Sequence, residues 1–167
     1  MYFCHDNKKI CALKVYKYID EITKNKKLPK VVCVKTSCIR PKYDNLREWL
    51  EDPENVYIGR KGFVMIDRKR FFYKGSIWAN PFKLSKESLN FSALAEKFKL
   101  TEDNKDITRE NVIDKYRTYI LEKLTLGIIK YEELEGLRGK NIGCWCKDKG
   151  EDAQCHGDVL LEILKNR

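Results

Sequence analysis

Three cysteines and a histidine near the C-terminal end of the chain have types and spacing that indicate chemistry. Cys144 and Cys146 are two residues apart, and Cys155 and His156 are adjacent after an interval of eight residues. Side chains two apart on a strand share a face, so both sulfurs point one way and Trp145 points the other. Three thiolates and one imidazole form a common tetrahedral zinc site. We therefore expect Zn²⁺ held by these four side chains in a structural role.

The adjacent pair sets a geometric condition on this zinc site. A regular helix separates neighbouring side chains by about 100°, whereas a loop can turn both toward one ion. The spacing also differs from the usual cysteine pairs separated by two residues. Two other interpretations therefore stay open beside the preferred metal site, a catalytic thiol and a set of ordinary buried cysteines.

In the catalytic interpretation Cys155 is a nucleophile. It precedes an expected helix, whose free N–H groups and dipole lower a thiol pKa from its usual value of about 8.5. His156 or Asp158 would accept the proton. Asn80, together with the helix N–H groups, would stabilise a developing anion.

Three polar residues elsewhere in the sequence are candidates for ligand binding. Arg60 follows an expected strand, where open α/β sheets bind ligands, and a guanidinium suits phosphate or carboxylate. Asn80 lies between aromatic residues and before Pro81, so its amide faces a ligand or bonds its own backbone. Arg117 is expected on a long helix, facing either the site or solvent.

The charge balance favours an anionic partner. The chain has 34 Lys and Arg against 25 Asp and Glu, a net charge of +9. This excess favours nucleotides or nucleic acid, or reflects a lysine-rich composition with most lysines solvated. Basic and aromatic residues are interleaved over residues 60–74. On one sheet face they would suit a single-stranded nucleic acid. Strand alternation would instead place some of these aromatic residues in the core.

Length and composition indicate one ordinary domain, with 167 residues of which 43% are hydrophobic. No apolar run approaches the roughly 20 residues of a membrane span, and the first residues lack a secretory signal. We therefore expect a soluble cytoplasmic protein with no membrane partner. Its seven cysteines are then free thiols or metal ligands rather than disulfides.

Hydrophobic periodicity predicts strands that alternate with helices, which is typical of a single-domain α/β fold with a mixed or mostly parallel sheet flanked by helices. Strands are expected at 31–35, 56–58 and 140–146. A hairpin is expected over 63–66 and 70–73, with a loop longer than two residues because no glycine supplies a tight turn. Helices are expected from Asp44, over 88–98, from the Thr108 cap to 126, and over 131–137 and 157–165.

The first 30 residues are expected to form a separate helical extension. Apolar residues recur at helical spacing over 11–25, and Pro29 closes a polar connection. We divide the chain into this extension, 1–30, and an α/β domain, 31–167. The extension is a candidate contact for a protein partner. It also holds Cys4, His5 and Cys11, a weaker cluster than the C-terminal one.

Several motifs, taken in order, resemble one family. They are Tyr57-Ile58-Gly59-Arg60, Ser76-Ile77-Trp78-Ala79-Asn80-Pro81-Phe82, Tyr116-Arg117, Cys144-Trp145-Cys146 and Cys155-His156-Gly157-Asp158-Val159-Leu160. Together they are similar to domain of unknown function 4326, a small family of bacteria, phages and large DNA viruses. The resemblance runs from about residue 31 to the C-terminus, with Ala79 where the family pattern has glycine.

The resemblance implies which positions recur in the family, and these are Arg60, Asn80, Pro81, Arg117, Cys144, Cys146, Cys155, His156 and Asp158. Such a mixture is more typical of a ligand or catalytic site than of a purely structural one. Members in phages and large viruses imply work on nucleotides or nucleic acids.

The preferred hypothesis is a zinc-containing α/β domain that binds a nucleotide or nucleic acid, with Arg60 and Arg117 on phosphate. One alternative is an enzyme that acts on a nucleotide-type substrate through Cys155, His156 and Asp158. Another is a viral structural or interaction protein, located in the virion or the host cytoplasm.

Overall fold

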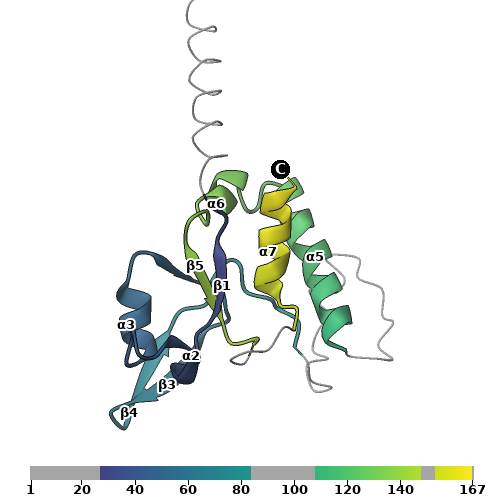
Figure 1. Cartoon of the computed structure of the whole chain (residues 1–167). Coiled ribbons are helices and arrows are strands. Elements are labelled where there is room, and N and C mark those ends of the chain that lie inside the picture. The colour runs from purple at the N-terminus through teal and green to yellow at the C-terminus, as the bar shows by residue number, and fades with distance from the viewer. Residues whose placement is uncertain (1–26, 84–107, 148–152, 167) are drawn as a thin grey trace, which may run out of the picture.

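A parallel sheet lies at the centre of the computed structural model, which describes residues 27–83, 108–147 and 153–166 (Figure 1). Its strands are β1 (Lys30–Cys33), β5 (Asn141–Cys144) and β2 (Asn55–Tyr57), in the order β1-β5-β2. Ile142 of the central strand pairs with Val31 on one side and Val56 on the other. The α/β class and the parallel sheet predicted from the sequence are confirmed.

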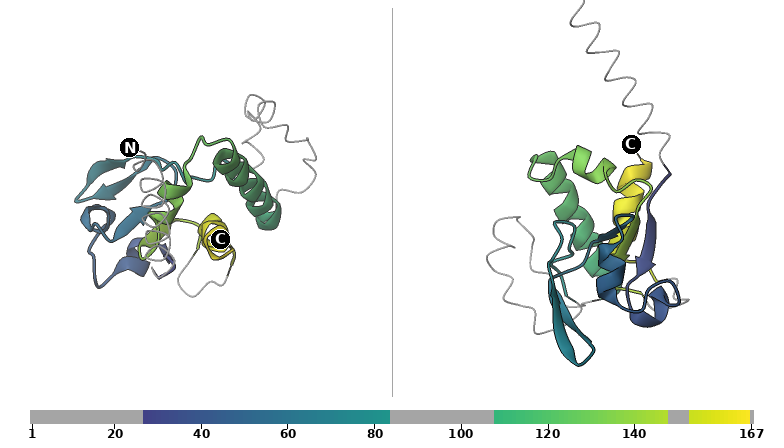
Figure 2. Two further views of the ribbon diagram at one scale, coloured as in Figure 1. Left: turned by 90° about the horizontal axis from the view of Figure 1, so that it is seen from above. Right: turned by 90° about the vertical axis from the view of Figure 1, so that its left-hand side faces the viewer.

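Helices cover both faces of this sheet. The long α5 (Arg109–Thr125), the short α6 (Tyr131–Glu135) and α7 (His156–Lys165) lie on one face. On the other lie α2 (Thr36–Ile39), α3 (Leu46–Glu51) and an antiparallel hairpin of β3 (Gly62–Ile66) and β4 (Lys69–Tyr73). Figure 2 shows the sheet between these two groups.

Strand alternation divides the core in the same way. Ile58 and Ile142 are fully buried against α5, α6 and α7. Tyr57 and Trp145 turn to the other face and pack around Trp49 of α3. Gly143 makes this second packing possible, because a Cβ there would overlap the Trp49 indole.

The long helix begins and ends as its sequence predicts. The Thr108 hydroxyl accepts a hydrogen bond from the Asn111 N–H over 3.2 Å, which caps the helix N-terminus. Gly127, with φ of +67°, follows the helix in a left-handed conformation that suits glycine. The buried positions are Val112, Ile113, Tyr116, Tyr119, Ile120 and Leu124.

Two details of the expected secondary structure are wrong. Ile66 pairs with Lys69, so the hairpin loop holds only Asp67 and Arg68, with φ of 50° and 62°. Two left-handed residues match the type I′ turn that suits twisted hairpins, and aspartate tolerates this conformation without glycine. The strand expected over 140–146 ends at Cys144, and the chain bends at Trp145 and Cys146.

Some predicted elements lie outside the described residues. These are the helices over 11–25 and 88–98, and the cluster of Cys4, His5 and Cys11. Among the described helices, none has the length and apolar character needed to cross a membrane.

Candidate metal centre and adjoining pocket

The end of β5 and the start of α7 bring the four predicted ligands together. Cys144 ends the strand, Cys146 follows in the bend, and His156 is the first residue of the helix. Cys155 is in extended conformation, with φ of −135° and ψ of 171°. Because only one of the adjacent pair is helical, both side chains turn inward. The three sulfurs and one imidazole nitrogen all lie within 4.8 Å of one another, so the structure brings the four residues together in a cluster that could hold a metal ion.

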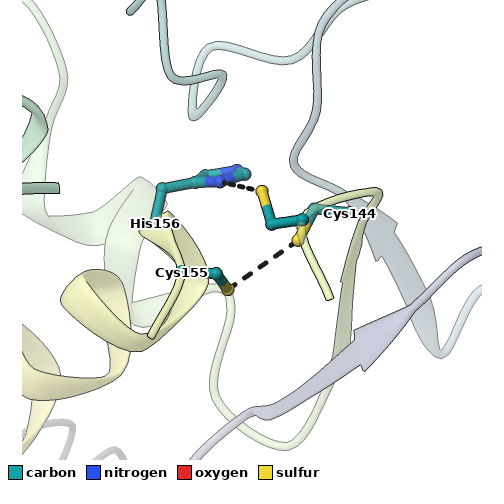
Figure 3. Close-up of side chains that lie close together, drawn as sticks. Cys144, Cys155 and His156 are labelled. Carbon is teal, nitrogen blue, oxygen red and sulfur yellow. Dashed lines mark hydrogen bonds between the residues drawn. The ribbon is translucent and has the colours of Figure 1, made fainter. Parts of the chain in front are cut away.

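One sulfur–sulfur distance in this cluster matches that of a tetrahedral metal site. Sulfurs bound to zinc at about 2.3 Å lie about 3.8 Å apart in a tetrahedral site. The sulfurs of Cys144 and Cys155 are 3.8 Å apart, and His156 Nδ1 is 3.1 Å from the Cys146 sulfur (Figure 3). Cys144, Cys155 and His156 are almost completely buried. The donor set and its spacing therefore suit a metal ion.

The imidazole of His156 is held in the form that binds a metal. Its Nε2 donates a hydrogen bond to the Ile58 carbonyl oxygen over 2.9 Å, so Nδ1 presents its lone pair to the sulfurs. The ring of Tyr116 packs edge-on against the imidazole, with centroids 5.3 Å apart. Burial lowers the pKa of His156, which keeps the ring neutral.

Crowding of the sulfurs makes their charges depend on one another. Thiol hydrogen bonds from Cys144 and Cys155 lower the pKa of Cys146 to about 3. The same hydrogen bond to Cys146 raises the pKa of Cys144 well above its ordinary value. One thiolate is therefore favoured and a second is opposed, and a bound cation would offset the repulsion among three thiolates.

Gly157 lets α7 start close to the sheet. A Cβ at this position would lie 2.9 Å from a methyl of Val31 and 3.1 Å from the Ile58 Cδ1. Such contacts are too short, so only glycine allows this approach without a shift. The close approach carries Cys155 and His156 to the end of β5.

Asp158 holds the loop that precedes the helix. Its carboxylate accepts a hydrogen bond from the Cys155 N–H over 2.7 Å and pairs with Lys147 Nζ at 2.8 Å. It therefore closes a capping box. The imidazole of His156 contacts the Cys146 sulfur, and the Asp158 carboxylate contacts the Cys155 N–H and Lys147. These hydrogen bonds and the ion pair do not place a base on the Cys155 sulfur.

A pocket of about 430 Å³ adjoins the cluster, and all four cluster residues line it. Three cations, Arg60, Lys61 and Arg109, also line this pocket. Aromatic rings of Tyr57, Tyr73, Phe82 and Trp145 form much of the remaining wall. The described lining includes no Asp or Glu. The pocket is thus cationic and aromatic.

Two of the predicted ligand-binding residues, Arg60 and Asn80, lie in this lining. Arg60 Nη1 donates hydrogen bonds of 3.2 Å to the carbonyl oxygens of Asn80 and Phe82. The Asn80 side-chain oxygen accepts a hydrogen bond from the Phe82 N–H over 2.9 Å. Of the two alternatives considered for Asn80, this is the bond to its own backbone. Arg60 therefore ties the 80–82 loop to the end of β2 and gives this wall of the pocket its shape.

Arg117 lies elsewhere. Its Nη1 pairs with Glu162 of α7 at 2.7 Å, and it lines a separate hollow with Leu121 and Tyr131. The structure therefore does not bring Arg117 together with Arg60 and Asn80.

Sequence reasoning missed Arg109 as a residue of the site. Its Nη1 donates to the Cys146 carbonyl oxygen over 3.1 Å. A signal was present, because Arg109 is the first residue of α5, where the helix dipole disfavours a positive charge. An arginine at such a position indicates a partner outside its own helix.

Comparison with known proteins gives a family match. The model of a family described as a domain of unknown function (DUF4326) matches residues 42–166, which confirms the resemblance. The chain is also 35% identical over 57 residues to the "Uncharacterized 12.4 kDa protein in nrdA-td intergenic region" of Enterobacteria phage T4. This alignment covers 34% of the chain and 49% of the phage protein, about half of the relative's length. No solved structure matches the chain.

The matched region leaves out one strand of the sheet. β1 ends at Cys33, before residue 42, yet it forms one edge of the three-stranded sheet. The folded unit described by the structure therefore begins before the family match.

Proposed function

The chain belongs to the family described as a domain of unknown function (DUF4326), and we propose that it is a zinc-containing domain that binds a nucleotide. The observation that carries this proposal is the pocket beside the cysteine–histidine cluster, with its three cations and its aromatic wall. The cations would bind phosphate, the aromatic wall would take the base, and the metal would hold the pocket in shape.

The cations favour an anionic ligand. Lys61 and Arg109 line the same pocket as Arg60, so three cationic side chains meet there. Charge-assisted hydrogen bonds from arginine to phosphate are among the stronger ones in proteins. The net charge of +9 would add a general attraction for polyanions.

The aromatic wall is already fixed in position. Trp145 and Tyr73 are stacked, with ring centroids 6.4 Å apart and planes at 25°. The Trp145 Nε1 donates to the Tyr57 hydroxyl over 3.1 Å, and that hydroxyl donates to the Arg60 carbonyl oxygen over 2.8 Å. Burial raises the pKa of Tyr57, so its hydroxyl stays protonated and remains a donor. A fixed wall reduces the entropy cost of binding a flat base.

The metal would act through the shape of the pocket. Cys144, Cys146, Cys155 and His156 could supply four protein ligands. Four protein ligands are typical of a structural zinc site. Zinc here would join the end of β5 to the start of α7. Because Trp145 lies between two ligands, the same ion would fix one aromatic wall.

Titration of the zinc-loaded chain with each of the four ribonucleoside 5′-monophosphates tests this proposal. Trp145 lines the pocket, whereas Trp49 and Trp78 are buried, so the change in fluorescence on binding should disappear in Trp145→Phe. Calorimetry gives the affinity without relying on that signal. Lys61→Gln should weaken binding about tenfold, as expected for loss of a charged hydrogen bond.

The control is Lys165→Gln, which makes the same charge change on an exposed residue at the end of α7. It should bind like the wild type. Absence of saturable binding by the zinc-loaded chain, or equal losses in both lysine variants, would contradict a nucleotide pocket.

A further inference from the structure

The β3–β4 hairpin has an outward face that carries two exposed aromatic rings, Phe63 and Phe72. We propose that this face binds a single strand of nucleic acid, with bases stacked on Phe63 and Phe72 and phosphates on Arg70. This second site goes beyond the nucleotide pocket and does not depend on it, since none of these three residues lines the pocket.

The pairing of the hairpin places these side chains together. Phe63 pairs with Phe72, and Met65 pairs with Arg70, so all four share one face of the ribbon. The two phenylalanine rings lie 5.7 Å apart with planes at 48°. Phe63 is 49% exposed, Met65 59% and Phe72 69%. Two neighbouring rings therefore stand open to solvent.

The opposite face of the same hairpin already has its partner. Val64 and Tyr73 point inward and pack against the core around Trp49. Packing among the described residues covers the apolar side chains of the inner face, whereas those of the outer face are exposed. Figure 1 shows the hairpin projecting from the rest of the domain, so its outer face is accessible.

The charges around the exposed rings favour a polyanion. The Arg70 guanidinium carbon lies 5.1 Å from the centroid of the Phe63 ring, so this cation stands beside the aromatic pair. Asp67 is the only acid in the sequence from Gly59 to Lys83, against seven basic residues: Arg60, Lys61, Arg68, Lys69, Arg70, Lys74 and Lys83.

A single strand suits this surface better than the alternatives. Its unpaired bases stack on aromatic side chains while its phosphates meet cations. A duplex would meet the charges without using the exposed rings, and protein interfaces are depleted in lysine. Lys61 stands at the base of the hairpin and also lines the pocket. A strand on the hairpin would thus lead toward the pocket.

Fluorescence anisotropy with labelled 15-nucleotide oligo-dT and oligo-rU tests this inference on the zinc-loaded full chain, at several salt concentrations. Phe63→Leu/Phe72→Leu keeps the exposed face apolar but removes the stacking rings. It should weaken binding about tenfold or more, with the salt dependence unchanged. Arg70→Gln should reduce the slope of log K against log salt by about 0.7, the value for one phosphate of a single strand.

Lys165→Gln is the matched control for Arg70→Gln. It removes one charge at the C-terminal end of α7, at the far end of the molecule from the hairpin in Figures 1 and 2. This variant should leave the affinity for the strand within about twofold of the wild type, because the proposed phosphate contacts of the strand lie on the hairpin. Circular dichroism of all variants checks that they are folded.

The inference is overturned if the wild type binds neither oligonucleotide at low salt, or if the double leucine variant binds them as tightly as the wild type. A wild type that forms dimers in sedimentation, and becomes monomeric in the double leucine variant without binding strands, would assign this face to self-association instead. Mononucleotide binding separates the two proposals. A chain that binds oligonucleotides but not mononucleotides contradicts only the nucleotide pocket. A chain that binds mononucleotides but not oligonucleotides contradicts only the hairpin site.

Discussion

The Nε2 atom of His156 donates a hydrogen bond to the carbonyl oxygen of Ile58 over 2.9 Å, joining the first residue of α7 to the residue after β2. This bond decides which imidazole nitrogen is free. Since a carbonyl oxygen can only accept, the proton is on Nε2 and the Nδ1 lone pair faces the sulfurs. In many metal sites the second ring N–H of a histidine ligand donates to a carboxylate or a carbonyl oxygen, and the Ile58 carbonyl is the acceptor here.

Replacement of His156 by alanine should weaken zinc binding by more than about 100-fold. The variant loses a ligand, whereas loss of a group behind a ligand alone costs about 10- to 100-fold. Competition with a chromogenic chelator measures the change. Unchanged affinity in His156→Ala would mean that the imidazole is not a ligand and that the three cysteines hold the ion with another group.

Purified chain should contain about one zinc ion, and both Cys146→Ser and Cys155→Ser should lose it. Elemental analysis of untagged protein, prepared without chelators, measures the content. Cys38→Ser is the control, because Cys38 lies in α2, outside the cluster. It should keep its metal.

Removal of the ion should also lower thermal stability. A ligand present at a thousandfold excess over its Kd stabilises the folded state by about 4 kcal/mol. Removal of the ion by a chelator should therefore lower the free energy of unfolding by about the same amount. Metal-free wild type that melts at the same temperature as the loaded protein would contradict a structural ion here.

Gly157→Ala should destabilise the fold by about 1–3 kcal/mol, the usual cost of an added methyl group in a packed site. The new methyl would lie 2.9 Å from a methyl of Val31, which belongs to a different element. Urea unfolding of the zinc-loaded protein measures the loss.

A second substitution tests the cause of that loss. Val31→Ala would remove the methyl groups that an alanine at 157 approaches most closely. Gly157→Ala should therefore cost less free energy of unfolding in the Val31→Ala background than in the wild type. Equal costs in both backgrounds would show that contact with Ile58, rather than contact with β1, makes glycine necessary.

The cysteine set could be predicted from the sequence because it depends on local geometry. Residues two apart at a strand end share a side, and Cys144 and Cys146 both face the cluster although the strand stops at Cys144. The Thr108 cap and the apolar positions of α5 are likewise local signals. The parallel sheet could be predicted from the alternation of strands and helices, since such an order favours crossover connections between parallel strands.

The positions of Arg117 and Arg109 could not be predicted from the sequence, because they depend on contacts between distant elements. Arg117 pairs with Glu162, 45 positions further along the chain, and this pairing appears only once α5 and α7 pack together. Arg109 donates to the carbonyl oxygen of Cys146, which is 37 positions further along the chain. The hairpin turn was missed for a local reason, because Asp67 and Arg68 adopt left-handed conformations more typical of glycine and asparagine.

Reaction with iodoacetamide distinguishes a closed metal site from a catalytic thiol. In the zinc-loaded protein at neutral pH, Cys144, Cys146 and Cys155 should react far more slowly than Cys38, because a metal-bound and buried sulfur is poorly accessible. Chelation should expose all three together, and mass spectrometry of the digested chain identifies the modified residues. Rapid, selective modification of Cys155 in the loaded protein would instead favour a nucleophile at the start of α7. That result is not expected from this structure, because Asp158 bonds the backbone of Cys155 and the imidazole of His156 faces the Cys146 sulfur.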